Sequence, residues 1–272
     1  MCNQFSVINH SIVSEKEALV HVSDLSIQRG YGIFDYFRTV NGKPVFLEAH
    51  INRFYQSAKS MHLNTSVHSE ELKELIYQLI SANNLPNSGI RITLTGGYSP
   101  DGYTLADPNL FITQSAFNFN KTNFAKGIKL ISYEYARELP LIKTINYLQA
   151  IYLQPLIKSK NADDVIYYSN NEILECPRAN IFIVTQQNEL LTPANGVLKG
   201  ITRNTILSFN EFGGRETNIS LEQLYNAKEV FITSTTKNVL PVLAINDQPI
   251  GDGQPGVISS HIYEKLIQLK EV

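Results

Sequence analysis

Three short stretches of the chain place polar side chains at the junctions of predicted elements: Lys143–Tyr147, Glu175–Asn180 and Gly200–Arg203. Lys143 lies between an apolar run and a predicted helix, where a lysine is either exposed to solvent or desolvated enough to form a Schiff base. Glu175 ends a predicted apolar strand, and an exposed carboxylate is the more common outcome because glutamate is rarely buried without a partner. The residue types alone leave both choices open.

The third stretch, with Gly200, Ile201 and Thr202, opens a predicted helix. The first N–H groups of a helix lack intrahelical acceptors and the helix dipole favours negative charge, so this start could bind a phosphate. The same residues also fit an ordinary helix start with Thr202 as the N-cap, which is the more frequent case.

Other catalytic chemistry has little support in the sequence. None of the six histidines forms a pair at spacing i, i+2 or i, i+4, and the motifs HEXXH, GXSXG and GXXXXGK[ST] are absent. Metal hydrolases and nucleoside triphosphatases are therefore disfavoured, and no metal site is predicted. His50, beside a predicted helix face, is expected to be a packed or capping residue.

The composition predicts a globular protein with one large domain or two small ones. The chain has 272 residues, of which 43% are hydrophobic. Its 23 basic and 25 acidic residues form neither a basic stripe nor a charge block, which argues against nucleic-acid and membrane-surface binding. A small molecule is the default partner.

The cysteines and the N-terminus indicate a cytoplasmic protein. Cys2 and Cys176 are too few for a disulfide framework or a structural zinc site, so a reducing compartment is expected, with Cys176 as a small core residue. The N-terminus lacks a basic leader, and no segment approaches the ~20 consecutive apolar residues of a membrane span.

Hydrophobic periodicity predicts a mixed α/β (α+β) fold. The expected strands lie at 33–40, 90–95, 109–114, 128–135, 164–168, 172–176, 180–184 and 189–192. The expected helices lie at 47–61, 72–83, 145–156, 202–212 and 259–269. Residues 5–45 show mostly strand periodicity, and Asn41-Gly42 between 33–40 and the short run 44–46 predicts a hairpin turn. Pro155 is expected to kink its helix or mark the last turn. The polar, aperiodic stretch 116–127 predicts a crossing between two domains, 1–117 and 118–272.

Five motifs occur in the order RGYGIFDYFRTVNGKPVFLEAHINRF, KTINYL, ECPRANIF, VLKGITR and FITSTTKNVLPV. In this order they resemble the class IV transaminases, which are fold type IV enzymes dependent on pyridoxal 5′-phosphate (PLP). The resemblance covers nearly the whole chain. It implies a small N-terminal α/β domain, a larger C-terminal domain with a β-barrel-like sheet and helices, PLP bound between them, and a homodimer.

The resemblance assigns roles to individual residues. Lys143 matches the lysine that holds PLP as a Schiff base and then moves protons, and Glu175 matches the carboxylate facing the pyridine nitrogen. Arg53, Ile201 and Thr202 match residues that bind the phosphate.

Three further positions match less directly. Thr235, with Thr236 beside it, matches a further phosphate contact, and Tyr147 matches a tyrosine that bonds the phenolic oxygen of PLP in branched-chain relatives.

The substrate-binding positions depart from both familiar patterns. Bacterial D-amino acid transaminases place Arg and His where this chain has Asp101 and Tyr103. The branched-chain pattern of tyrosine and arginine is missing too, because the strand offers only Arg91, which is expected to lie too far upstream. Arg29, lent by a second subunit, and Arg178 are the hypothetical carboxylate clamp; the alternative is that both are exposed surface residues.

The leading functional expectation is a transaminase with ping-pong kinetics. It passes the amino group of an amino acid to a 2-oxo acid such as 2-oxoglutarate or pyruvate, with D-amino acids slightly favoured. The alternatives are a branched-chain L-amino acid transaminase and a 4-amino-4-deoxychorismate lyase, which differ in their need for an acceptor. A non-catalytic PLP-binding homologue is disfavoured because Lys143 and Glu175 are both present.

Overall fold

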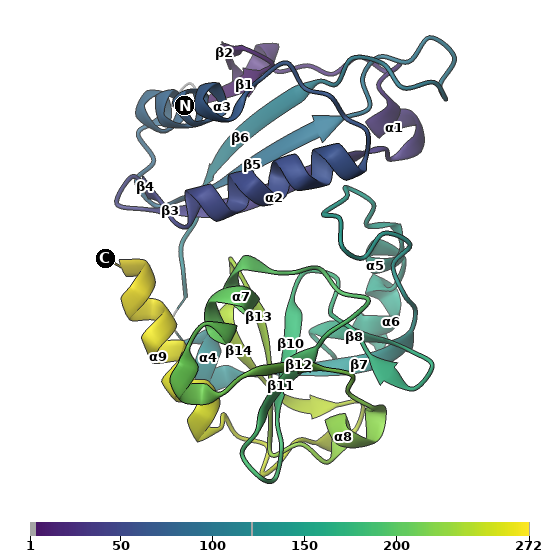
Figure 1. Cartoon of the computed structure of the whole chain (residues 1–272), viewed down its shortest axis with the longest axis vertical. Coiled ribbons are helices and arrows are strands. Elements are labelled where there is room, and N and C mark those ends of the chain that lie inside the picture. Colours follow the sequence, from purple (N-terminus) through teal and green to yellow (C-terminus); the bar gives the residue numbers. More distant parts are fainter. Residues whose placement is uncertain (1–3, 121, 272) are drawn as a thin grey trace. The chain divides into compact units, whose positions relative to one another are not determined.

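The computed structural model describes residues 4–120 and 122–271 (Figure 1). The chain forms two compact units. Unit 1 comprises the residues up to Asn118 together with Ile142–Asn146, and unit 2 comprises Phe119–Leu141 and the residues from Tyr147 onward. The expected division placed 142–146 in the C-terminal part, whereas their backbone pairs with a strand of unit 1. Cys2 lies outside the described residues.

Unit 1 is built on a six-stranded antiparallel sheet with the order β2-β1-β6-β5-β3-β4. Its strands are β1 (Phe5–Ile8), β2 (Ser11–Ser14), β3 (Gly32–Val40), β4 (Lys43–Pro44), β5 (Ser88–Thr95) and β6 (Leu110–Ala116). The predicted turn at Asn41-Gly42 joins β3 and β4, with both residues at positive φ. The hairpin expectation is therefore confirmed.

Two long helices, α2 (Leu47–Ser60) and α3 (Ser69–Asn83), bury their apolar residues against this sheet. Both were predicted from their 3.6-residue periodicity. A short helix, α1 (Leu25–Arg29), was not predicted. It begins at the cap Asp24, whose carboxylate accepts from Ser26 N, and ends where Gly30 adopts φ +65°. A 3₁₀ turn, η1 (Glu15–Glu17), follows β2.

Unit 2 is built on a nine-stranded sheet with the order β12-β11-β10-β13-β14-β7-β8-β9, and β15 pairs with β14. The strands are β7 (Ile128–Glu134), β8 (Asp164–Ser169), β9 (Glu172–Ile173), β10 (Asn180–Val184), β11 (Leu190–Pro193), β12 (Arg215–Thr217), β13 (Glu229–Ser234), β14 (Asn238–Ile245) and β15 (Gln248–Pro249). Three pairs are parallel, β11 with β12, β14 with β7 and β7 with β8. Buried side chains cover both faces of the central strands β10 and β13.

The helices of unit 2 are short, except for the last one. They are α4 (Asn123–Lys126), α5 (Leu148–Tyr152), α6 (Gln154–Ser159), α7 (Ile201–Leu207), the 3₁₀ turn η2 (Asn210–Phe212), α8 (Leu221–Tyr225) and α9 (Val257–Glu271). The single helix predicted over 145–156 is wrong, because α5 begins only at Leu148 and Pro155 sits in the first turn of α6. The stretch 116–127, expected to be irregular, contains α4.

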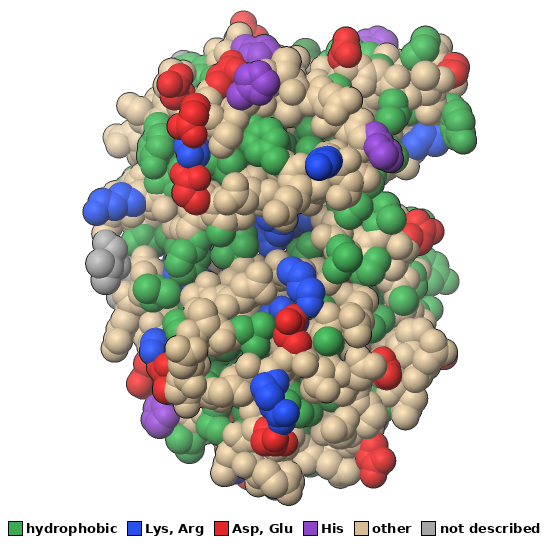
Figure 2. Space-filling model, in the orientation of Figure 1, with side chains coloured by type: hydrophobic (Ala, Val, Ile, Leu, Met, Phe, Trp, Pro, Cys, Tyr) green, Lys and Arg blue, Asp and Glu red, His purple; other side chains and the backbone are tan. Residues whose placement is uncertain are grey.

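The surface over α5 and α6 exposes hydrophobic side chains (Figure 2). Leu148, Ile151 and Tyr152 are each more than 60% exposed. In the described part of the chain, no helix is long and apolar enough to cross a membrane. Cys176 is buried, as predicted.

Candidate active site

Lys143 lies in an extended segment that runs beside β3 in unit 1. Phe34 N donates to Lys143 O at 2.9 Å, and Ile145 N donates to Gly32 O at 3.0 Å. Gly32 permits this approach, since a Cβ there would lie 2.8 Å from Leu94 O and 3.1 Å from Ile145 Cδ1. The lysine is therefore carried by backbone pairing to a sheet rather than by a helix start.

The Lys143 amine lies over an aromatic ring that it shares with an arginine. Lys143 Nζ is 4.4 Å from the centroid of the Phe34 ring, and Arg91 Cζ is 3.9 Å from the same centroid. Phe34 is only 6% exposed, so the ring is a fixed platform for both cations. The expectation that Arg91 lies too far upstream is corrected: strand pairing of β3 with β5 brings Arg91 to the ring beneath the lysine.

Arg53 is held on α2 by a buried carboxylate. Arg53 Nε and Nη2 each donate to Asp35 at 2.8 Å, and His50 Nδ1 lies 2.7 Å from Asp35 Oδ1. Burial raises the pKa of Asp35, but Arg53 and His50 outweigh it and hold that pKa well below its ordinary value. These bonds occupy two of the five N–H donors of the guanidinium, so the Arg53 group keeps donors for an anion. His50 is a packed residue, as predicted.

Arg29 and the loop that follows β5 lie on the surface of unit 1. The Arg29 side chain is exposed and donates from Nη1 to Gln28 O at 2.9 Å. Asp101 accepts hydrogen bonds from Ser99 Oγ and from the backbone of Tyr103 and Thr104. The Asp101 carboxylate thus closes its own loop, which leaves Tyr103 85% exposed at the loop tip.

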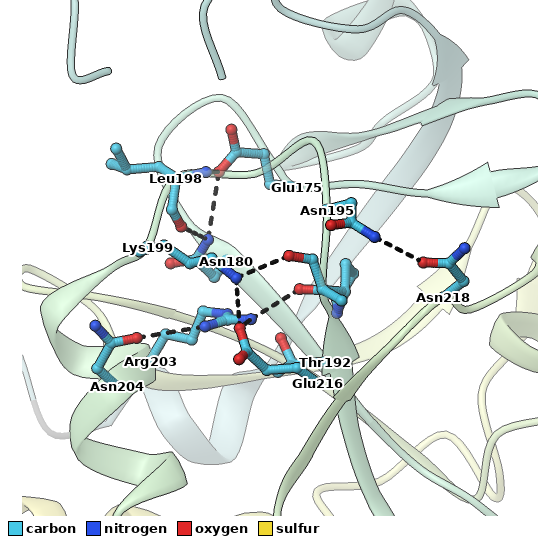
Figure 3. Close-up of polar contacts among 12 residues, drawn as sticks. Glu175, Asn180, Thr192, Asn195, Leu198, Lys199, Arg203, Asn204, Glu216 and Asn218 are labelled. Carbon is cyan, nitrogen blue, oxygen red and sulfur yellow. Dashed lines mark hydrogen bonds and ion pairs between the residues drawn. The ribbon is translucent and has the colours of Figure 1, made fainter. Parts of the chain in front are cut away.

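Glu175 in unit 2 is buried and fully engaged (Figure 3). It is 5% exposed, which excludes the exposed strand end that sequence alone favoured. Arg137 Nε and Nη2 donate to Glu175 Oε1 at 2.8 and 2.6 Å, while Leu198 N and Asn180 Nδ2 donate to Oε2 at 3.1 and 3.3 Å. Arg137 compensates a buried negative charge, and sequence analysis missed it.

The loop between β11 and α7 is hydrogen-bonded to Glu175 through Leu198. Asn180 Nδ2 also donates to Leu198 O at 2.7 Å, so one amide side chain bonds both the carboxylate and the loop. A Cβ on Gly200 would lie 2.0 Å from Asn180 Oδ1, which only glycine avoids. Gly200 is the N-cap of α7, so the prediction of Thr202 as the N-cap is wrong. Ile201 and Thr202 occupy the first turn and are buried.

The remaining predicted positions of unit 2 lie in turns. Thr235 and Thr236 belong to the turn between β13 and β14, where Ser234 Oγ accepts from Lys237 N at 3.1 Å and lies 3.3 Å from Thr236 Oγ1. Tyr147 is half-buried and immediately precedes α5.

Arg178 is exposed in the turn bridged by Cys176 and Ala179. Its charge acts on Lys237: burial lowers the pKa of Lys237, Asp164 opposes this effect, and the Arg178 guanidinium lowers that pKa further. Two cationic side chains, Arg178 and Lys237, are therefore associated with the turn between β13 and β14.

Known proteins with similar sequences identify the family. Residues 32–245 match the family model described as amino-transferase class IV. The chain belongs to the class IV aminotransferases. The D-alanine aminotransferase of Listeria monocytogenes is 29% identical over 96% of this chain and 94% of its own length. The family accounts for the order of the motifs.

Two solved structures of class IV relatives share the fold. The branched-chain amino acid aminotransferase of Escherichia coli has a TM-score of 0.91 and 25% identity, over 98% of this chain and 95% of that one. A putative 4-amino-4-deoxychorismate lyase of Legionella pneumophila has a TM-score of 0.85 and 25% identity, over 94% and 97%. The expected fold type IV architecture is confirmed.

As a class IV aminotransferase, the protein is a PLP-dependent enzyme acting on amino acids and oxo acids. The side chains fit this cofactor chemically. The chain holds the side-chain types that this chemistry requires: a primary amine at Lys143, a buried carboxylate at Glu175 and a guanidinium at Arg53.

Proposed function

We propose that this aminotransferase uses a D-amino acid as its amino donor and 2-oxoglutarate or pyruvate as its acceptor. The observation that carries this proposal is the similarity to D-alanine aminotransferases, which extends over 96% of the chain at 29–30% identity in Listeria and Staphylococcus relatives. The carboxylate-binding positions diverge from both the D-amino acid and the branched-chain patterns, so they favour neither.

The proposed site divides the work among the residues described above. PLP, when bound, supplies an aldehyde that accepts the amino group and a ring that stabilises negative charge at the substrate Cα. Lys143 would hold the cofactor through Nζ and, as a free amine, would move a proton to and from the substrate Cα as a general base and acid. Its position over Phe34, fixed by backbone pairing, restricts the amine to one side of the β3 strand.

Glu175 faces the pyridine nitrogen in this proposal, and its four hydrogen bonds from Arg137, Leu198 and Asn180 keep the carboxylate from rotating. A fixed anion keeps the nitrogen protonated and the ring electron-withdrawing.

The phosphate is assigned to two groups of donors. In unit 1, Arg53 donates from a guanidinium oriented by Asp35. In unit 2, the backbone amides of Ile201 and Thr202 and the hydroxyls of Thr235 and Thr236 are the assigned donors.

The substrate carboxylate requires charge-assisted donors, and three arginines are candidates for this role. Arg29 and Arg178 remain the proposed clamp, with Arg29 lent by a second subunit. Arg91 joins them as a candidate because it shares the Phe34 ring with Lys143. Tyr147 remains assigned to the phenolic oxygen of PLP.

We also propose a cytoplasmic homodimer. The exposed hydrophobic side chains of α5 support a partner of the same kind, because soluble proteins rarely leave such clusters uncovered. The small number of cysteines supports the cytoplasmic location.

A half-reaction screen tests the substrate assignment. The PLP-loaded protein is mixed with single D- or L-amino acids without an acceptor, and the absorbance band of the bound cofactor is followed. D-Alanine is expected to bleach the band faster than L-alanine and L-leucine. Faster bleaching by L-leucine would replace the proposal with a branched-chain enzyme.

The similarity to the Legionella protein makes the lyase the second candidate. A lyase would release 4-aminobenzoate from 4-amino-4-deoxychorismate with no oxo acid present. Strict dependence on an oxo-acid acceptor, with no 4-aminobenzoate formed, is the expected result.

A further inference from the structure

One carboxylate on the edge of the unit 2 sheet binds two cations, one from the loop that precedes α7 and one from α7 itself. Glu216 lies in β12, and its Oε1 accepts hydrogen bonds from Lys199 Nζ and Arg203 Nη2 (Figure 3). Basic and acidic side chains alternate on the surface over β11 and β12 in Figure 2. Glu216 differs from Glu189 on the same edge, because Glu189 pairs with Arg215 whereas the partners of Glu216 belong to the loop before α7 and to α7 itself.

The two cations that meet at Glu216 are not equivalent. Lys199 is half-buried, whereas Arg203 is only 1% exposed. A buried guanidinium is costly unless a counter-charge lies beside it. Hydrogen bonds from Lys199 and Arg203 hold the pKa of Glu216 below its ordinary value, so the carboxylate is ionised at neutral pH. Without that charge, a lysine and a buried arginine would face each other directly.

The same cations also hold the two ends of the loop together, Lys199 from within the loop and Arg203 from α7. Lys199 Nζ donates to Ala194 O at 2.7 Å, and Arg203 Nη2 donates to Pro193 O at 2.8 Å. Residues 194–200 are thereby closed into a compact turn against β12.

The closed loop presents one backbone amide to the buried acid. Leu198 is the neighbour of Lys199, and its N–H donates to Glu175 Oε2 while its carbonyl accepts from Asn180. Moving Lys199 would therefore move a direct hydrogen-bond donor of Glu175.

We propose that Glu216 is a positioning residue that bridges Lys199 and Arg203 with its negative charge and so holds the loop 194–200 with the Leu198 amide against Glu175. The inference rests on the proposed function in one respect, the role of Glu175 toward the PLP ring. The contacts that carry it lie entirely within unit 2.

Glu216→Gln tests the proposal, with Glu189→Gln as the matched control. Glu189 pairs with Arg215, the neighbour of Glu216 on β12, so the control removes the same charge from the same edge without touching the loop. Hydrogen exchange of the PLP-free proteins measures directly how well the backbone of loop 194–200 is protected. The peptide covering 194–200 should exchange faster in Glu216→Gln than in wild type and Glu189→Gln, while peptides of β13 stay unchanged.

Cofactor binding supplies the second readout. Titration of the PLP-free proteins should give a PLP dissociation constant raised at least about tenfold in Glu216→Gln, as for other residues that orient a direct ligand. Wild-type exchange in the loop of Glu216→Gln, or an equal effect of Glu189→Gln, would overturn the proposal.

A double variant separates like-charge repulsion from general loss of structure. In Lys199→Met/Glu216→Gln the second cation is gone and the glutamine oxygen can still accept from Arg203. Loop exchange and PLP affinity should therefore recover in part, because the repulsion is relieved although the Lys199–Ala194 hydrogen bond is lost. A double variant as impaired as Glu216→Gln contradicts the proposal. If wild-type protein binds no PLP, the proposed function fails, and the exchange data still decide the role of Glu216.

Discussion

Arg137 and Glu175 form the buried ion pair on which the proposed chemistry depends most directly. Replacing Arg137 by Met leaves an unpaired buried carboxylate, which costs about 3 kcal/mol of unfolding free energy. Urea unfolding of the PLP-free protein measures this loss. Arg215→Met, which breaks an exposed pair, should cost less than about 1 kcal/mol. Equal losses in the two variants would show that Glu175 is not the reason for the sensitivity.

The chemical types of single residues could be predicted from sequence, but their partners could not. Lys143 and Glu175 stood out because amine and carboxylate chemistry is specific to side-chain type. Arg137 is 38 residues from Glu175, and no local spacing connects them. Arg91 was misjudged because its distance from Lys143 depends on the register of β3 with β5, which a single sequence does not encode.

At the level of elements, the long helices and the short strands β8–β11 were predicted, whereas strands β13 and β14 and the limits of several short helices were not. Helices α2 and α3 have a continuous apolar face, so the pattern fixes them. Helices of five to seven residues, such as α1, α5 and α7, have few apolar repeats, and tertiary contacts decide where they begin. The segment of Lys143 was expected to lead directly into a helix, whereas its backbone pairs with β3 in an extended conformation.

The packing of α2 on β3 predicts an acid-sensitive stability. Burial lowers the pKa of His50 below its ordinary 6.5, although Asp35 raises it. The unfolded chain therefore binds more protons than the folded one near pH 6, and stability falls as the pH drops through 6.5. The lowered pKa of Asp35 has the same sign, but its contribution is lost only below its ordinary 3.8.

Melting temperatures between pH 7.5 and 5.5 measure the His50 contribution. Wild type should lose stability over this range, and His50→Gln should show a flatter dependence even though it starts lower. His261→Gln, at an exposed position of α9, should keep the wild-type slope. A His50→Gln slope equal to that of wild type would exclude the buried histidine as the titrating group.

At the level of the whole molecule, the order of five motifs identified the family, because each motif surrounds a chemically constrained residue and together they span both units. The motifs do not predict which amino acid is the substrate. The residues proposed to bind its carboxylate differ from those of the familiar relatives, and all three arginines lie at exposed positions, where packing constrains the residue type weakly. A second subunit would complete such loops, which makes the oligomeric state a functional question.

The exposed face of α5 gives the assembly prediction. Leu148 and Tyr152 are 77% and 72% exposed and lie four residues apart, so they project from the same side of the helix. If this face contacts a second copy, Tyr152→Lys places a charge in an apolar interface and should shift the particle from dimer to monomer in sedimentation velocity. Val257→Lys, a change of the same kind at an exposed position of α9, should leave the mass unchanged. A wild-type protein that sediments as a monomer would remove the second subunit, and with it the assignment of Arg29 to a neighbouring site, whereas Arg91 would remain available because it lies in the same unit as Lys143.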